Sequence, residues 1–327
     1  MTISKNKVTA RAYTNIALIK YWGKVDQKLK IPTTSSLSLT LKDFYTDTSV
    51  LFNEKLLEDK ITFNGQQLSE KKAERIVNFL DVVRDLAQQN VYAEVSTINK
   101  VPTSAGLASS ASGFAALAAS ASKAIGLNLN KKDLSRLARR GSGSATRSIY
   151  GGFVEWEKGF SDETSYAVPF EEEVDWPINV VAVMVNQSEK QMSSSKGMQI
   201  SVNTSPYYSA WEKVSKKALK EIKVAIKNRD FDRMGKIAEE NAMQMHALTL
   251  SSSPDYTYFD ADSLKVMNLV HGLRSSGLTC YFTMDAGPNV KILVEKQNTS
   301  KLVSELEKEF GSDKVIVTSA GPGIEYQ

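Results

Sequence analysis

The sequence predicts an α+β protein built from two lobes. The chain opens on a series of strand patterns rather than on repeated strand–helix–strand units, and its later part consists of long amphipathic helices around a pair of strands. A length of 327 residues with 42% hydrophobic residues suits two domain-sized units. We place the boundary near residue 185, where a buried strand pattern gives way to polar residues. The expected lobes are residues 1–185 and 186–327.

The first lobe contains segments with the apolar spacing of strands and segments with the apolar spacing of helices. Strand patterns occupy residues 8–20, 37–41, two segments within 49–63, and 91–98. Helical spacing of apolar residues predicts helices over residues 71–88, 112–125 and 131–140. Asn130 is a suitable N-cap for the last of these, and Gly141 a suitable stop.

In the second lobe, helices dominate. Their apolar stripes cover residues 206–228, 231–247, 263–276 and 299–310. Strand patterns lie at residues 278–284, 290–295 and 314–318, and the apolar run at 180–185 has the length of a buried strand. Together these segments predict a compact α+β lobe.

Composition excludes several classes of protein. Lys and Arg number 41 against 37 Asp and Glu, so the net charge of +4 gives no reason to expect a nucleic-acid partner. The single cysteine, Cys280, excludes an internal disulfide and suits a buried core position. Two histidines argue against a multi-histidine metal site, and we expect His246 to be a packed helix residue. No segment has the length of an apolar membrane span, so we expect a cytoplasmic protein with no membrane partner.

A loop rich in small residues joins a predicted strand to a predicted helix over residues 102–111. Unpaired amides at a helix start attract anions, and Gly106 allows a ligand to approach the backbone. Ser109 and Ser110 add hydroxyl groups, and Ser109 is the candidate ligand for a metal ion. The Lys-Ser/Thr ending of a Walker A loop is absent. A tightly packed helix start would explain the same residues equally well.

Five segments together resemble one known family. Pro-Thr-Ser-Ala-Gly-Leu-Ala-Ser-Ser-Ala at 102–111 is similar to the phosphate-binding motif of the GHMP kinase superfamily. Asn-Ile-Ala-Leu-Ile-Lys-Tyr-Trp-Gly-Lys at 15–24 resembles the opening of its mevalonate diphosphate decarboxylase branch. The other matching segments are residues 142–148, 194–198 and 281–290. The resemblance implies a two-lobed GHMP kinase fold: an N-terminal lobe like ribosomal protein S5 domain 2, a ferredoxin-like C-terminal lobe, and an active site between them.

The resemblance also implies a reaction. The family converts (R)-5-diphosphomevalonate to isopentenyl diphosphate, ADP, phosphate and CO2 by phosphorylating the 3-hydroxyl, a step of the mevalonate pathway of isoprenoid biosynthesis. ATP is the co-substrate and Mg2+ accompanies its phosphates, and a homodimer is the expected assembly. The residues that match the ATP phosphate site are Pro102, Ser104, Ala105, Gly106, Leu107, Ala108, Ser109 and Ser110.

Three residues match catalytic positions of the family. Arg147 would hold the substrate carboxylate, because a guanidinium donates two parallel hydrogen bonds to a planar anion. Asp285 would meet the 3-hydroxyl, either as a base or as an orienting group. Ser194 would lie near the reacting centre. Without the resemblance, a solvated arginine, a turn aspartate and a flexible polar loop over residues 193–195 are the ordinary interpretations.

The remaining matched residues belong to substrate binding. They are Tyr21, Lys24, Lys20, Asn15, Ser144 and Lys196, which offer hydroxyl, amide and ammonium groups to a carboxylate and a diphosphate. The sequence departs from many bacterial relatives, which carry asparagines in place of Thr34 and Ser35 and an arginine in place of Ser195. Lys196 is a possible replacement for that arginine.

Two other functions remain open from the residues. A GHMP kinase would phosphorylate an alcohol and stop, but Arg147 points to a substrate that carries a carboxylate. A non-catalytic nucleotide-sensing module would use the same scaffold, but it would have no need of Asp285 or Lys24.

Overall fold

The computed structural model describes residues 3–101, 109–186 and 192–327. The first sheet has eight strands in the order β14-β1-β4-β7-β5-β6, with β8 paired to β4 and β9 paired to β8; all of them except β14 come from the N-terminal part. Its strands are β1 (Val8–Ile19), β4 (Ser36–Phe52), β5 (Lys60–Phe63), β6 (Gln66–Gln67), β7 (Ala93–Asn99), β8 (Phe153–Glu157), β9 (Tyr166–Glu171) and β14 (Glu325–Tyr326). A small hairpin, β2 (Lys24–Asp26) and β3 (Ile31–Pro32), stands apart from the sheet.

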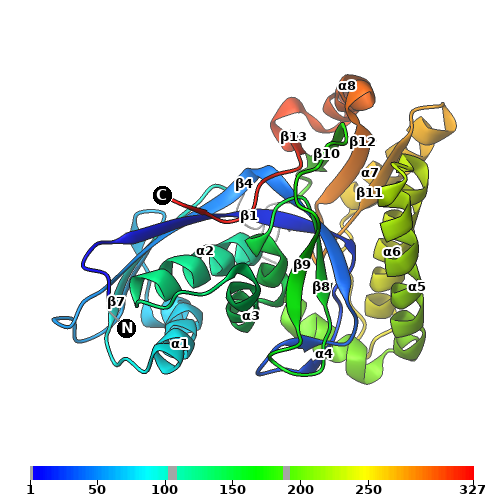
Figure 1. The fold of residues 1–327 in the computed structure, drawn as a ribbon. Helices are drawn as coiled ribbons and strands as arrows, with labels where there is room; N and C mark the ends of the chain where they lie inside the picture. The colour runs from blue at the N-terminus through cyan, green and yellow to red at the C-terminus, as the bar shows by residue number, and fades with distance from the viewer. Residues whose placement is uncertain (1–2, 102–108, 187–191) are drawn as a thin grey trace.

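Helices cover one face of this sheet (Figure 1). They are α1 (Glu70–Ala87), α2 (Ser109–Ala124) and α3 (Lys131–Gly141), followed by the 3-10 turn η1 (Gly143–Ile149). Buried alanines such as Ala115 and Ala118 let α2 lie close against β1 and β4. The helix over residues 131–140 is confirmed with its cap, because the Asn130 side chain accepts a hydrogen bond from the Asp133 amide.

The C-terminal part is built on a second, antiparallel sheet in the order β11-β12-β10-β13. Its strands are β10 (Ile178–Val183), β11 (Cys280–Thr283), β12 (Val290–Glu295) and β13 (Val315–Ser319). The helices are α4 (Ser194–Thr204), α5 (Tyr208–Lys227), α6 (Phe231–Leu250), α7 (Ala261–Ser275) and α8 (Thr299–Phe310), with short 3-10 turns η2 (Lys296–Asn298) and η3 (Ser312–Lys314). Helices α5 and α6 run side by side along one edge of the molecule (Figure 1).

Strand β10 is apolar on both faces because both faces are buried. Val181 and Val183 belong to the core under α7 and α8, whereas Val180 and Ala182 pack toward α5, α6 and β1. The core that contains Val180 and Ala182 therefore joins the two lobes.

The division near residue 185 stays a prediction. Because β10 pairs with β12 and β13, we propose that the lobes divide before Ile178.

The structure differs from the sequence predictions at several places. The strand pattern at residues 37–41 is the start of the 17-residue strand β4. Strands β8 and β9 were not predicted. Residues 193–195, which read as a flexible polar loop, form the cap and first turn of α4, with the Ser193 hydroxyl accepting from the Lys196 amide.

Candidate active site

A cavity of about 570 Å³ lies between the two lobes. The N-terminal part contributes the end of β1, the segment after it and the 3-10 turn η1, while the C-terminal part contributes the start of α4 and the turn after β11. The predicted site residues that line this cavity are Asn15, Lys20, Tyr21, Lys24, Ser110, Ser144, Arg147, Ser194 and Asp285. Segments that are remote in sequence thus converge on one site.

The other predicted site residues lie elsewhere. Ser109 lines a neighbouring cavity, and Lys196 is an exposed residue in the first turn of α4. The predicted phosphate-loop residues Pro102, Ser104, Ala105, Gly106, Leu107 and Ala108 lie outside the described residues.

Asp285 is surrounded by cations. Its Oδ1 accepts a hydrogen bond of 2.8 Å from Lys20 Nζ, and its Oδ2 lies 3.8 Å from Lys291 Nζ. Burial alone would raise the pKa of the Asp285 carboxyl, but the charges of Lys20, Lys291 and Arg147 outweigh it and hold that pKa below its usual range. The carboxylate is therefore ionised at neutral pH.

The end of β1 fixes Lys20 against the other lobe. Its backbone amide donates to the Asn241 side chain of α6 at 2.8 Å, and its ammonium also donates to the Ala17 carbonyl at 2.7 Å. The side chain is 1% exposed. Burial lowers the pKa of the Lys20 amine, and the nearby Asp285 opposes this shift. The pair is thus a buried link between the lobes as well as part of the site.

Arg147 is buried on η1 and held by neutral partners. Its Nη1 donates to Ser36 Oγ at 2.6 Å, and its Nη2 donates to Asn15 Oδ1 at 3.2 Å. Asn15 is oriented in turn by its amide, which donates to Ser148 Oγ at 2.8 Å. Burial lowers the pKa of Arg147 to about 10, so the guanidinium stays charged at neutral pH. A fixed charge that forms no ion pair with a carboxylate of the described residues is suited to an anionic ligand.

Several buried polar atoms of this cavity have no hydrogen-bond partner among the described residues. They are Tyr21 Oη, Arg147 Nε and Asp285 Oδ2. Leaving such atoms unsatisfied costs about 1–3 kcal/mol each, and more for charged groups. A ligand with both hydrogen-bond donors and acceptors would satisfy these atoms. A hydroxy acid has both, since its hydroxyl donates and its carboxylate accepts.

Lys24 lines the cavity and connects the two lobes. Its Nζ donates to Ser195 Oγ at the start of α4, at 2.8 Å. Burial and the nearby Arg75 lower the pKa of the Lys24 amine. Behind it, the Tyr21 ring packs on Trp156 with centroids 4.7 Å apart. Tyr21 is thus held in the cavity by its contact with a buried tryptophan.

Sequence reasoning missed some residues of the site. Lys291 lies on β12, and its side chain is 0% exposed. Its position in the strand pattern does not mark it as a site residue. Lys30 and Arg75 line the cavity from the β2–β3 hairpin and from α1. Nothing in the sequence distinguished Lys291, Lys30 or Arg75 from surface cations.

A smaller cavity of about 320 Å³ adjoins the larger one, and both are lined by Arg75 and Ser110. Its walls come from α1, α2 and strands of the first sheet, and they are mainly apolar. The apolar lining residues are Phe63, Leu68, Ile76, Phe114 and Leu117, with Lys72 and Asn99 among the polar ones. This composition is typical of sites for a flat, partly polar ligand.

The chain is similar to one family of proteins over nearly its whole length. Residues 12–167 match the family described as the diphosphomevalonate decarboxylase-like N-terminal domain. Residues 180–322 match the mevalonate 5-diphosphate decarboxylase C-terminal domain. The diphosphomevalonate decarboxylase of Debaryomyces hansenii is 37% identical over 95% of this chain and 84% of its own length.

Solved structures give the same result. Mevalonate diphosphate decarboxylase from Staphylococcus aureus is 50% identical, with a TM-score of 0.95 over 98% of both chains. A relative described as MDDEF in complex with MVAPP, AMPPCP and magnesium is 48% identical, with a TM-score of 0.94 over 98% of both chains. The predicted α+β GHMP kinase fold is confirmed. This chain belongs to the diphosphomevalonate decarboxylase family.

Proposed function

We propose that this protein catalyses the ATP-dependent decarboxylation of (R)-5-diphosphomevalonate to isopentenyl diphosphate, with release of ADP, phosphate and CO2. The observation that carries the proposal is that Asp285 and Arg147 line one cavity in a chain of this family, each with a buried atom that has no hydrogen-bond partner among the described residues. The first suits a tertiary hydroxyl and the second a carboxylate, and the substrate carries both groups on neighbouring carbons.

The two cavities suit the two substrates. Diphosphomevalonate occupies the larger cavity, with its carboxylate on Arg147, its 3-hydroxyl on Asp285 and its diphosphate toward Tyr21 and Lys24. The nucleoside of ATP occupies the smaller cavity. Because Arg75 and Ser110 line both cavities, the transferred phosphoryl group passes near these residues. The relative with bound MVAPP and AMPPCP supports simultaneous occupancy.

Asp285 acts first by fixing the hydroxyl. The 3-oxygen attacks the terminal phosphorus of ATP, the bond to ADP breaks, and the hydroxyl proton leaves toward Asp285 or solvent. A carboxylate with a lowered pKa is a weak base, so orientation is its larger contribution. Phosphorylation turns the hydroxyl oxygen into part of a good leaving group.

The second half of the reaction follows from charge. When phosphate departs with its bonding electrons, C3 becomes electron deficient. The bond between C2 and the carboxylate then breaks, CO2 leaves, and its electron pair forms the double bond. Because Arg147 stabilises the carboxylate before this step, its role is to orient the group rather than to lower the barrier directly. Lys20, which lines the cavity beside Asp285, stabilises the negative charge that gathers on the departing phosphate.

Magnesium fits this site only together with the nucleotide. No group of three or more His, Cys, Asp or Glu side chains that could hold a metal occurs among residues 3–101, 109–186 and 192–327. Mg2+ commonly binds substrate phosphates and few protein groups, and Ser109 or Ser110 would add a hydroxyl ligand. When bound, the ion neutralises phosphate charge. The relative solved with magnesium supports the requirement.

The test is the stoichiometry of the products. Protein, Mg-ATP and diphosphomevalonate are incubated, and CO2, ADP and phosphate are measured together. We expect equal amounts of the three products. Formation of ADP with a stable phosphorylated product and no CO2 would instead identify a kinase, and no ATP turnover with any mevalonate derivative would identify a nucleotide-sensing module.

The setting of the enzyme is part of the proposal. No helix in the described part of the chain is both long and apolar enough to cross a membrane. We place the protein in the cytoplasm as a homodimer. Sedimentation analysis of the purified protein tests the assembly.

A further inference from the structure

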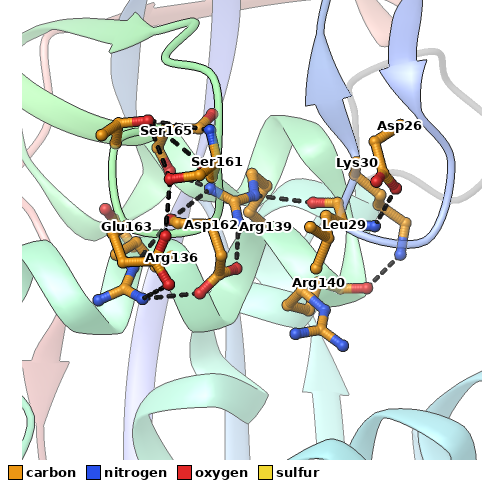
Figure 2. A network of polar contacts seen from close by, with 12 residues as sticks. Asp26, Leu29, Lys30, Arg136, Arg139, Arg140, Ser161, Asp162, Glu163 and Ser165 are labelled. Carbon is orange, nitrogen blue, oxygen red and sulfur yellow. Dashed lines mark hydrogen bonds and ion pairs between the residues drawn. The ribbon is translucent and has the colours of Figure 1, made fainter.

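The hairpin of β2 and β3 carries a lysine, Lys30, that the reaction as derived above does not use. Its backbone has φ 54, in the left-handed region that non-glycine residues rarely adopt. The residues around it hold the hairpin in place: the Leu29 amide donates to Asp26 Oδ1 at 2.7 Å, and Arg139 Nε donates to the Leu29 carbonyl at 2.8 Å (Figure 2). An uncommon backbone conformation that is held this firmly often serves a function.

The anchor of this hairpin is itself buried and paired. Arg139 is 0% exposed and forms an ion pair with Asp162, which also pairs with Arg136 at 2.7 Å (Figure 2). Lys30 Nζ donates to the Arg140 carbonyl in the last turn of α3 (Figure 2). The negative end of a helix dipole favours a cation at this place. The amine is therefore fixed where Lys30 lines the larger cavity.

The cations around Lys30 are not balanced by acidic groups. Lys24, Lys30 and Arg75 all line the larger cavity, and the ion pairs formed within the described part of the chain include none of the three. Like charges that gather in a partly buried site repel one another unless an anion binds between them. The arrangement thus indicates a site for a ligand with several negative charges.

We propose that Lys30 binds the diphosphate group of the substrate, together with Lys24, and so sets affinity for diphosphomevalonate. This inference rests on the proposed function. Lys30 lines the cavity that contains Asp285 and Arg147 and does not line the smaller cavity proposed for the nucleoside. The ligand group is therefore the substrate diphosphate rather than the phosphates of ATP.

The same surroundings make the contact sensitive to pH. Burial, followed by the charges of Lys24, Arg75, Arg140 and Arg139, lowers the pKa of Lys30 to about 8. The charged groups that act on Lys30 are Lys24 on the hairpin, Arg75 on α1, and Arg139 and Arg140 on α3. The nearby carboxylates have other partners, since Asp26 accepts from the Leu29 amide and Asp162 pairs with Arg139. In the free enzyme the amine loses its charge as pH rises through about 8, so the KM for diphosphomevalonate should increase above that pH.

The experiment compares Lys30→Met with Lys28→Met. Lys28 is an exposed lysine of the same hairpin and does not line the cavity, so it controls for the loss of one positive charge. At pH 7 we expect Lys30→Met to raise the KM for diphosphomevalonate roughly 10-fold, with kcat and the KM for ATP within about 3-fold of the wild type. Lys28→Met should match the wild type. Lys30→Arg should retain affinity and lose the increase in KM near pH 8, because a guanidinium stays charged.

An unchanged KM for diphosphomevalonate in Lys30→Met, an effect on ATP alone, or an equal effect of Lys28→Met would overturn the proposal. Thermal melting checks that the variants are folded. If Lys30→Met does not fold, an alkaline KM profile of Lys30→Arg identical to that of the wild type overturns it instead. Calorimetric binding of diphosphomevalonate separates this inference from the proposed function: a wild type that binds the compound but releases no CO2 contradicts the reaction, whereas equal binding by Lys30→Met contradicts the role of Lys30.

Discussion

The carboxylate of Asp285 faces three cations, and this imbalance is the main chemical feature of the site. Lys20 and Lys291 lie within 2.8 and 3.8 Å of its two oxygens, and the charge of Arg147 also acts on it. One negative charge among three positive ones leaves a net attraction for anions. A substrate with a carboxylate and a diphosphate, and a nucleotide with a transferable phosphoryl group, would both be drawn to it.

We expect Asp285→Asn to lower kcat by at least about 100-fold while changing the KM for diphosphomevalonate by less than about 5-fold. The amide cannot accept a proton, and it faces Lys20 and Lys291 without the compensating charge. Steady-state kinetics with both substrates measure the two constants. A kcat near that of the wild type would remove Asp285 from the mechanism.

Arg147→Gln should reduce kcat/KM for CO2 release by roughly 100-fold or more, because two charge-assisted hydrogen bonds to the carboxylate are lost. Arg147→Lys keeps the charge without the planar pair of donors, so it should recover only part of the activity. Release of CO2 measures both variants. If the KM for ATP alone increased, the carboxylate would be bound elsewhere.

Site residues could be predicted from the sequence where they belong to a recognisable motif. Asn15, Tyr21 and Lys24 share one short segment, and the structure brings them to the same cavity as Asp285. Their roles stay predictions. Lys291 and Lys30 could not be identified because a lysine in a strand or hairpin is usually solvated. Only the fold reveals that Lys30 lines the cavity and that Lys291 Nζ lies 3.8 Å from Asp285 Oδ2.

At the scale of elements, two irregularities position the site. The pairing of β1 with β4 shifts register between Tyr13 and Asn15, which re-aims Asn15 toward Arg147. After α3, the segment around Gly143 passes close to the Tyr21 ring. A Cβ at Gly143 would lie 2.7 Å from the nearest ring carbon.

Gly143→Ala should therefore displace Tyr21, lower stability by about 1–3 kcal/mol and raise the KM for diphosphomevalonate. Gly272→Ala is the matched control, since a Cβ there has no atom within 4 Å and the residue lies within α7. The control should be as active as the wild type and more stable by about 0.5–1 kcal/mol. Urea unfolding and kinetics measure both properties. Normal affinity in Gly143→Ala would show that this close approach does not position Tyr21.

The elements were predicted best where a regular pattern of apolar residues runs through the whole element. The helix at residues 299–310 is confirmed as α8, and the strands after residue 278 are confirmed as β11 and β12. Helix α4 was hidden because its first turn is a run of serines, which favour both caps and loops. The full length of β4 was hidden because its middle carries exposed Lys42 and Asp43 where the strand changes partners.

At the scale of the whole molecule, buried polar and aromatic residues form the contact between the two lobes. The Trp22 carbonyl accepts hydrogen bonds from Tyr208 Oη at 2.9 Å and from Trp211 Nε1 at 3.1 Å. His246 is buried on α6, and its ring lies 4.7 Å from that of Phe259. Burial, followed by the charge of Lys20, lowers the pKa of His246 from 6.5 to about 3.

This histidine should make the fold sensitive to acid. Between pH 6.5 and about 3 the unfolded chain binds a proton at His246 that the folded chain does not, so the free energy of unfolding decreases as pH falls. The decrease approaches about 1.4 kcal/mol per pH unit below pH 6. Urea unfolding of the wild type and His246→Gln between pH 7 and 5 measures it. We expect a shallower pH dependence in the variant; equal slopes would show that His246 is not held neutral.

A crystal structure with diphosphomevalonate and a non-hydrolysable ATP analogue tests the proposed mechanism most directly. We expect the substrate in the larger cavity, with its 3-hydroxyl within about 2.6–3.2 Å of an Asp285 oxygen, its carboxylate on Arg147 and its diphosphate on Lys24 and Lys30. A carboxylate that binds away from Arg147, or a hydroxyl that does not reach Asp285, would contradict it.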